Sequence, residues 1–141
     1  MIRLRTFNNH PKDRIHYEDT VPLARRVLKG EGKKHAECNI IFISDKRMRG
    51  LHDRYLHDRN TTDVLSFPMS ANGGKDVEGE IYISLDQARR QSKIYNVTIK
   101  KEIERLVIHG ILHLIGYRDK TKREKLKMTK LEDFYLQKRK R

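Results

Sequence analysis

Two histidines four residues apart give this sequence its clearest chemical signal. His109 and His113 lie in a stretch, 106–115, that is otherwise almost entirely apolar. Residues four apart lie one turn apart on the same face of a helix, so both imidazoles can reach one ion at the short distances that zinc requires. Burying imidazoles among aliphatic side chains is costly unless each is hydrogen-bonded or bound to a metal. The pattern therefore predicts a buried helix that carries two metal ligands.

A third ligand is expected just after this helix. Gly116 can adopt the left-handed conformation that ends a helix, so the chain can turn back beyond it. The residues His109, His113, Gly116 and Asp119 match the spacing of the metzincin zinc pattern, with a carboxylate at the place of the third ligand. Two histidines and one carboxylate leave a position open for water on the ion. We therefore predict one metal ion bound by His109, His113 and Asp119, with zinc as the default and nickel or another divalent metal as the alternative ion. Two core histidines that only hydrogen-bond to backbone carbonyls are the alternative to a metal site.

The residue after the first histidine counts against peptide hydrolysis. Zinc peptidases place their general-base glutamate there, whereas this chain has Gly110. A protease with this spacing would lack its proton acceptor. We expect zincin-like ligand spacing combined with a different chemistry.

Strands and helices alternate along the rest of the chain. Short runs of apolar and β-branched residues predict strands at 2–5, 40–43, 64–67 and 80–83. Caps and periodicity predict helices at 17–29, 45–55, 85–95 and 99–115, and a last helix from the capping box at 121–124. We expect the inward face of that last helix to be formed by Leu126, Leu131, Phe134 and Tyr135.

These elements predict an α/β (α+β) fold made of a single domain over residues 1–141. In it, helices pack on a small mixed sheet of about four strands, and the helix with the metal-binding histidines is buried at the centre. The basic tail 138–141 is expected to be disordered rather than an ordered binding site.

The charge of the chain favours an anionic partner without identifying it. The 141 residues include 32 Lys and Arg against 19 Asp and Glu, a formal net charge of +13. The segment 118–141 alone holds eleven basic and four acidic residues. Basic residues on the first and last helices could follow an RNA backbone, and the alternative is a solvated charged face. Aromatic residues make up only 7% of the chain, too few to indicate a base-stacking platform.

Several classes of protein are excluded by composition. The single cysteine, Cys38, allows neither a disulfide framework nor a cysteine-based zinc knuckle. The longest apolar run, at 106–115, is too short to cross a bilayer, and no hydrophobic segment near residue 1 resembles a secretory signal. We expect a soluble, cytoplasmic protein with no membrane partner.

Three motifs occur in an order and spacing that resemble one known family. The first runs from His109 to Tyr117 and reads H-G-I-L-H-L-I-G-Y; the second, at 62–68, reads T-D-V-L-S-F-P; the third, at 79–84, reads G-E-I-Y-I-S. Together they resemble the signatures of the YbeY family of single-domain metallo-endoribonucleases. The resemblance covers roughly residues 38 to 135.

The resemblance implies a specific activity. It implies a zinc-dependent, single-strand-preferring endoribonuclease that helps to form the 3′ end of small-subunit ribosomal RNA and acts in ribosome quality control in the cytoplasm. Its partners would be single-stranded ribosomal RNA and the ribosome or a ribosomal subunit. The alternatives are a non-catalytic RNA- or ribosome-binding factor with a structural zinc and, with less support, a zincin-like metal hydrolase of another substrate.

The chain departs from the family pattern at two positions. The commonest third ligand of the family is histidine, whereas this chain has Asp119, which adds negative charge to the site. The family arginine implicated in cleavage is replaced by Leu56. Arg54 or Arg59 is a candidate to supply that positive charge to the phosphate or the transition state, because both lie near Leu56 in the sequence.

The remaining motif residues have structural and catalytic interpretations. Glu80 is a candidate general base, although a glutamate at the start of a strand is more often a structural hydrogen-bond acceptor. Thr62, Asp63 and Ser66 are expected to hold the strand and loop beside the site rather than to perform chemistry.

Overall fold

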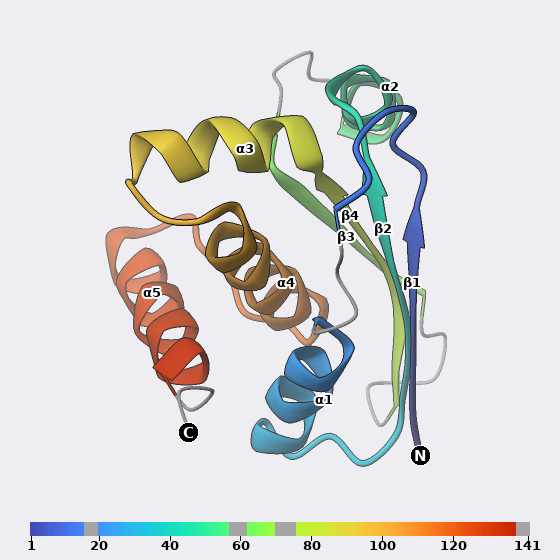
Figure 1. Ribbon diagram of the computed structural model, residues 1–141. Helices are drawn as coiled ribbons and strands as arrows, with labels where there is room; N and C mark the ends of the chain where they lie inside the picture. Colours follow the sequence, from blue (N-terminus) through green and yellow to red (C-terminus); the bar gives the residue numbers. More distant parts are fainter. Residues whose placement is uncertain (16–19, 57–61, 70–75, 138–141) are drawn as a thin grey trace.

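A mixed four-stranded sheet forms the framework of the protein. The computed structural model describes residues 1–15, 20–56, 62–69 and 76–137. The strands β1 (Ile2–Asn8), β2 (Ala36–Ile43), β3 (Val64–Pro68) and β4 (Val77–Ser84) lie in the order β1-β2-β4-β3 (Figure 1). β1, β2 and β4 run parallel, and β3 pairs antiparallel with β4 at the edge. The predicted mixed sheet is confirmed.

Five helices are described around this sheet. They are α1 (Thr20–Gly30), α2 (Asp45–Leu56), α3 (Leu85–Ile94), α4 (Ile99–Leu114) and α5 (Lys122–Gln137). α4, the predicted histidine helix, lies between the sheet and α5, with α1 beside it and α3 across its beginning (Figure 1). The fold is a single small α+β domain in which the histidine helix is central, as the sequence predicts.

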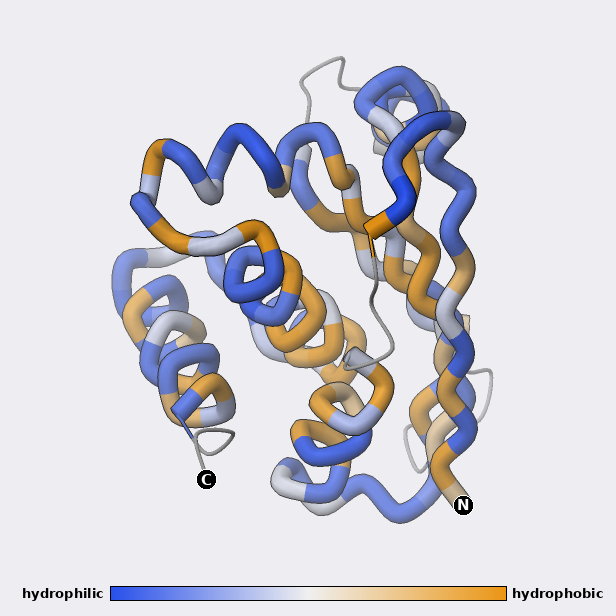
Figure 2. The backbone as a smooth tube through the Cα atoms, viewed as in Figure 1, coloured by the Kyte–Doolittle hydropathy of each residue, from blue (hydrophilic) through white to orange (hydrophobic). Residues whose placement is uncertain are grey.

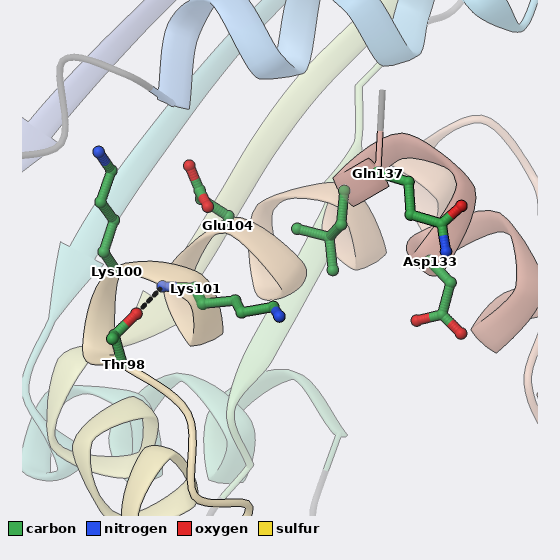
Figure 3. A pocket seen from close by; sticks show the side chains of 7 residues that line it. Thr98, Lys100, Lys101, Glu104, Asp133 and Gln137 are labelled. Atoms are coloured by element: carbon green, nitrogen blue, oxygen red, sulfur yellow. Dashed lines mark hydrogen bonds between the residues drawn. The ribbon is translucent and has the colours of Figure 1, made fainter. Parts of the chain in front are cut away.

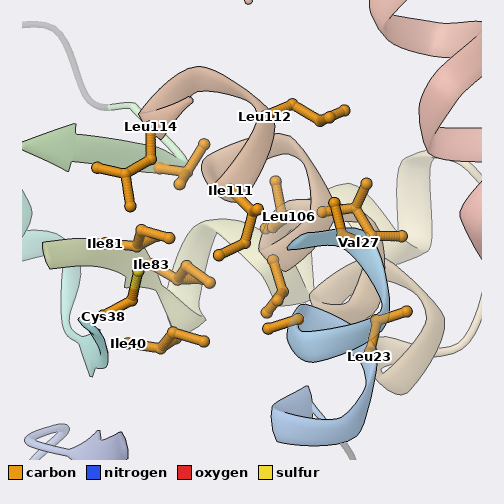
Figure 4. Close-up of a cluster of buried hydrophobic side chains, with 14 of the residues drawn as sticks. Leu23, Val27, Cys38, Ile40, Ile81, Ile83, Leu106, Ile111, Leu112 and Leu114 are labelled. Atoms are coloured by element: carbon orange, nitrogen blue, oxygen red, sulfur yellow. The ribbon is translucent and has the colours of Figure 1, made fainter. Parts of the chain in front are cut away.

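The main core fills the space between the sheet and α4. Ile40, Ile81 and Ile83 project from the strands toward Leu106 and Ile111 of α4 (Figure 4). A smaller cluster that includes Ile41, Met48 and Leu51 packs α2 against the other face of the sheet. In Figure 2, most of α4 is hydrophobic whereas α3 is largely hydrophilic. Two apolar faces therefore fix the sheet between α4 and α2.

Hydrogen bonds, more than the hydropathy of single residues, determine where the helices and strands begin and end. The Oγ of Ser84 accepts from the backbone N–H of Gln87 at 3.1 Å and caps α3. Thr121 and Glu124 form the predicted capping box: the backbone N–H of each donates to the side chain of the other, at 2.9 and 3.1 Å. β1 and β2 extend beyond the predicted 2–5 and 40–43, because polar residues also pair across the sheet.

The inward face of α5 agrees with the prediction at Tyr135 and at Leu131, which packs against the main core, but not at Leu126 and Phe134. Leu126 is 58% exposed and Phe134 is 46% exposed, whereas Met128, Glu132 and Tyr135 are buried. Leu126 precedes Tyr135 by nine residues, about two and a half helical turns, so the two side chains lie on opposite faces. The helical period, rather than the hydropathy of single residues, decides which face of α5 is buried.

Two further expectations from the sequence concern the tail and membranes. The tail 138–141 lies outside the described residues. No helix within the described residues is both long enough and apolar enough to cross a membrane.

Candidate metal centre

α4 fixes His109 and His113 by packing tightly on the sheet. The hydroxyl of Ser66 on β3 donates to the backbone carbonyl of Gly110 at 2.8 Å. A Cβ on Gly110 would lie 2.6 Å from Cγ2 of Ile81, well inside van der Waals contact. Only glycine allows α4 to approach the strands this closely, so a glutamate could not occupy this position without displacing the helix. Gly110 thus sets how closely the helix that carries the two histidines approaches the strands.

The chain reverses directly after α4. Gly116 has a φ of 113°, in the left-handed region, and the backbone N–H of Tyr117 donates to the carbonyl of Leu112 at 3.0 Å. The Tyr117 hydroxyl then donates to Oε1 of Glu31 at 2.5 Å, and the Tyr135 hydroxyl donates to the other oxygen of the same carboxylate. Glu31 thus ties the loop that bears Asp119 both to α5 and to the turn after α1.

The turn brings Asp119 to both histidines, as the sequence predicts. Oδ2 of Asp119 lies 3.4 Å from Nε2 of His109 and 3.2 Å from Nε2 of His113. The imidazole rings meet edge to face with centroids 4.6 Å apart. Among the described residues, His109, His113 and Asp119 form the one group of three that could hold a metal ion.

The spacing of these donor atoms fits a bound ion. Ligands at 2.0–2.1 Å from a tetrahedral zinc ion are about 3.3 Å from one another. The two distances from Asp119 agree with this value, and all three side chains are only partly buried, which leaves a side open to a substrate. The cluster has the donor chemistry and the geometry to bind a divalent metal ion.

A second carboxylate lies behind His109. Nδ1 of His109 is 2.6 Å from Oε2 of Glu132, whose side chain is 5% exposed. Metal-binding histidines commonly donate their second N–H to a carboxylate, which fixes the tautomer and the orientation of the ring. Sequence reasoning missed Glu132, although its place in the helical period of α5 between Met128 and Tyr135 puts a charged residue on the buried face.

Glu132 is itself held by a buried polar network. Nη1 of Arg105 lies 3.3 Å from Oε1 of Glu132, and the guanidinium also donates two hydrogen bonds to Glu102, the shorter at 2.6 Å. The side-chain amide of Gln91 donates to Glu102 at 2.7 Å. Arg105 therefore compensates the charges of two buried carboxylates and keeps Glu132 against His109.

The electrostatics of His109 follow from these neighbours. Burial lowers the pKa of His109, but the hydrogen bond and the charge of Glu132, together with the charges of Asp63 and Asp119, outweigh burial and raise it above its usual 6.5. Carboxylates therefore favour positive charge at this imidazole, whether a proton or a metal ion provides it. The involvement of Asp63 indicates that the loop before β3 belongs to the surroundings of the site.

No hydrogen bond or ion pair joins Arg54 to the cluster among the described residues. Arg54 is an exposed residue near the end of α2, and Arg59 lies outside the described residues. Leu56, at the position of the family arginine, ends α2.

Glu80 lies away from the metal centre. It accepts a hydrogen bond from the hydroxyl of Tyr82 at 2.9 Å. Its neighbour Ile81 faces α4, and side chains alternate along a strand, so Glu80 is on the opposite face of the sheet. Glu80 is a structural acceptor rather than a general base at this cluster.

A separate hollow of about 460 Å³ lies between the beginning of α4 and the end of α5. Lys100, Lys101, Glu104 and Asp133 surround it, and none of the three metal-centre residues lines it (Figure 3). Because both cations and carboxylates line this hollow, its charge favours neither an anionic nor a cationic ligand.

Known proteins resemble this chain over most of its length. A family model described as "Endoribonuclease YbeY" matches residues 6–140. A protein named Endoribonuclease YbeY from Flavobacterium psychrophilum is 36% identical over 107 residues, which cover 76% of this chain and 75% of the relative. One of the same name from Aquifex aeolicus is 33% identical over 129 residues, covering 90% and 86% of the two chains.

A solved structure shares the fold. The solution structure of TM1509 from Thermotoga maritima matches with a TM-score of 0.62, covering 95% of this chain and 87% of that protein. Its sequence identity is 23%, so the likeness concerns the fold alone.

Proposed function

This chain belongs to the family of YbeY endoribonucleases, and from that premise we propose that it cleaves single-stranded RNA at a metal ion bound by His109, His113 and Asp119. The observation that carries the proposal is the convergence of three donor atoms within 4.8 Å of one another, with the carboxylate of Asp119 at 3.4 and 3.2 Å from the two histidines. Membership of the family supports RNA cleavage as the reaction, and the geometry of the cluster supports His109, His113 and Asp119 as the metal ligands.

Each part of the centre has a proposed role. Nε2 of His109, Nε2 of His113 and a carboxylate oxygen of Asp119 hold the ion, and zinc is the metal that this donor set favours. When bound, such an ion supplies Lewis acidity to a phosphodiester and activates water. Glu132 keeps the tautomer of His109 that leaves Nε2 free for the ion. Glu31 and Tyr117 hold the loop that presents Asp119.

Asp119 in place of a histidine changes the charge of the centre. A carboxylate ligand lowers the net positive charge that the ion presents to the substrate. We expect a water at this centre to be less acidic than at a centre of three histidines. Cationic side chains around the centre then gain importance for binding the phosphate.

Arg54 or Arg59 is proposed to provide one such cation. Support comes from the sequence, since both lie next to Leu56, which replaces the arginine of the family. If single-stranded RNA is cleaved at the wild-type rate by Arg59→Ala, Arg59 is excluded, and the same test applies to Arg54→Ala.

The cellular role is proposed from the family. We propose that the substrate is the 3′ region of small-subunit ribosomal RNA, that the chain works with the ribosome or a ribosomal subunit, and that it acts in the cytoplasm. The formal net charge of +13 supports a polyanionic substrate.

A non-catalytic RNA-binding factor with a structural metal is the competing function. The open side of the His–His–Asp cluster argues against it, because structural zinc sites are closed by four protein ligands. Peptide hydrolysis is disfavoured further, because Gly110 stands where a peptidase has its glutamate and packs against the sheet.

Alanine variants of the three ligands test the proposed function. His109→Ala, His113→Ala and Asp119→Ala are expected to lose zinc and to abolish cleavage of a labelled single-stranded RNA. His35→Ala is the matched control, since His35 lies at the beginning of β2 and contacts the amino terminus instead. Cleavage at the wild-type rate by the ligand variants would refute the catalytic proposal. RNA binding without metal-dependent cleavage by the wild-type protein would favour the competing function.

A further inference from the structure

Several arginines of this protein are held by contacts within the fold. Arg25 and Arg26 donate to backbone carbonyls at 2.9 and 2.8 Å, and Arg89 pairs with Asp13 at 2.5 Å. Arg105 is occupied by its buried carboxylates. These cations are committed to internal contacts and are poorly placed to bind a ligand.

The segment 118–130 is the most densely basic stretch among the described residues. It holds seven basic residues, all exposed: Arg118, Lys120, Lys122, Arg123, Lys125, Lys127 and Lys130. We call these seven residues the α5 basic surface. Within the described part of the chain none of them forms an ion pair, and Lys127 alone has a ring contact, with its Nζ 5.4 Å from the centroid of Tyr117.

The two acidic residues of this segment do not neutralise it. Asp119 is the carboxylate of the metal centre, and Glu124 accepts the backbone N–H groups of Lys120 and Thr121 in the cap of α5. Both carboxylates keep their negative charge. Seven basic against two acidic residues leave the segment with a net charge of +5, so the local field of the surface remains positive.

The α5 basic surface adjoins the metal centre. Arg118 and Lys120 flank Asp119 in the sequence. Residues at the beginning of α4 and at the end of α5 line one hollow, while His109 meets Glu132 midway, so the two helices run antiparallel (Figure 1). The beginning of α5 thus lies toward the end of α4, which carries His113.

We propose that the α5 basic surface binds the phosphate backbone of single-stranded RNA next to the bond that is cut. The inference rests on the proposed function for the identity of the ligand. Charge complementarity supports it, because seven unpaired cations beside a metal centre attract and hold a polyanion. Sequence-independent contacts of this kind position the strand and leave the choice of bond to the centre itself.

Salt dependence of RNA binding tests the proposal. In the variant with Lys122, Lys125 and Lys130 each replaced by Gln, the affinity for a labelled single-stranded RNA at 100 mM salt is expected to fall about tenfold or more. The slope of log affinity against log salt should fall by about 2, since each single-strand phosphate contact contributes about 0.7. Lys127 is left unchanged because it contacts Tyr117 in the ligand loop.

A second triple variant supplies the matched control. Lys34, Lys46 and Lys93 are exposed lysines before β2, on α2 and on α3, and changing them to Gln removes the same total charge. This variant should keep the wild-type slope, and both variants should keep their zinc content and thermal midpoint. Equal losses in the two triple variants would overturn the proposal, because net charge alone would then explain binding.

Measuring binding with metal-free protein separates this inference from the proposed function. Loss of RNA binding in the Lys122/Lys125/Lys130 variant supports the surface even if the wild-type protein proves unable to cleave. Normal RNA binding by that variant overturns the surface even if cleavage is metal-dependent. Loss of binding only to phosphatidylglycerol vesicles, with RNA affinity unchanged, would assign the surface to a lipid membrane and would also overturn the proposal.

Discussion

Nδ1 of His109 lies 2.6 Å from Oε2 of Glu132, and this contact joins the metal centre to the buried face of α5. Glu132 comes from a helix that begins only after Asp119, the last of the three donors. The contact therefore exists only when α5 has packed against α4. The orientation of His109 is coupled in this way to the packing of α5 on α4.

Glu132→Gln should weaken metal binding. Gln keeps the size of the side chain but removes the charge that holds His109, and loss of such a partner typically costs about 10- to 100-fold in metal affinity. Competition against a chromophoric chelator measures the effect. Glu78→Gln, an exposed glutamate on β4, is the control and should bind zinc like the wild type. Unchanged affinity in Glu132→Gln would show that the contact does not support the centre.

Gly110→Ala should destabilise the protein even though alanine favours helices. The added methyl would meet Ile81 at 2.6 Å, and overpacking of this kind costs about 1–3 kcal/mol, more than the helix propensity gained. Gly50→Ala on α2 meets nothing within 4 Å and should instead stabilise by about 0.5–1 kcal/mol. Denaturant unfolding of both variants checks the prediction, and stabilisation by Gly110→Ala would contradict the close approach of α4 to the sheet.

The Asp13–Arg89 pair should give the protein an acid-sensitive contribution to stability. The hydrogen bond from Arg89 lowers the pKa of Asp13 below 3.8, and burial opposes this only in part. A lowered pKa in the folded state stabilises above the unfolded pKa, and that stabilisation is lost as the pH falls through the folded pKa. Asp13→Asn should therefore cost about 1 kcal/mol at pH 7. The difference from the wild type should shrink below pH 4, which unfolding curves at several pH values would detect; a constant difference would count against the pair.

Cys38 should be unreactive in the folded protein. Its side chain lies in the main core at 1% exposure, and burial raises the pKa of the thiol to about 12. Because the thiolate is the reactive form, a disulfide reagent at pH 8 should modify Cys38 only after denaturant is added. Rapid modification of the native protein would mean that the sheet opens far more readily than its packing indicates.

The sequence predicts the histidine helix and the turn after it better than it predicts how α5 packs on them. His109, His113 and Asp119 were predictable because their spacing reflects one helix and one turn, both of which depend on local chemistry. Glu132 lies far along the chain from its partner, and only the packing of α5 on α4 brings the two together. Leu126 shows the related error, since hydropathy favours its burial but the phase of α5 turns it to solvent.

The sequence leaves Glu80 with two interpretations, a candidate general base and, more often, a structural hydrogen-bond acceptor. The alternation of β4 puts Glu80 on the face opposite α4, where it accepts from Tyr82, in agreement with the structural interpretation. Neighbouring residues of a strand point to opposite faces of the sheet, so a shift of one residue moves a side chain from one face to the other. Only a residue on the face that α4 covers can belong to the metal centre. The role of Arg54 stays a prediction, because its exposed position on α2 does not by itself bring its side chain to the cluster.

Titration of the chelator-stripped protein with zinc tests the central claim most directly, with the rate of single-stranded RNA cleavage as the readout. The three donor atoms form one site, so the rate should rise from near zero to a plateau at about one zinc per chain. His113→Ala and Asp119→Ala should stay near zero over the same range. Full cleavage by the metal-free protein, or the same plateau in these variants, would contradict catalysis at this centre.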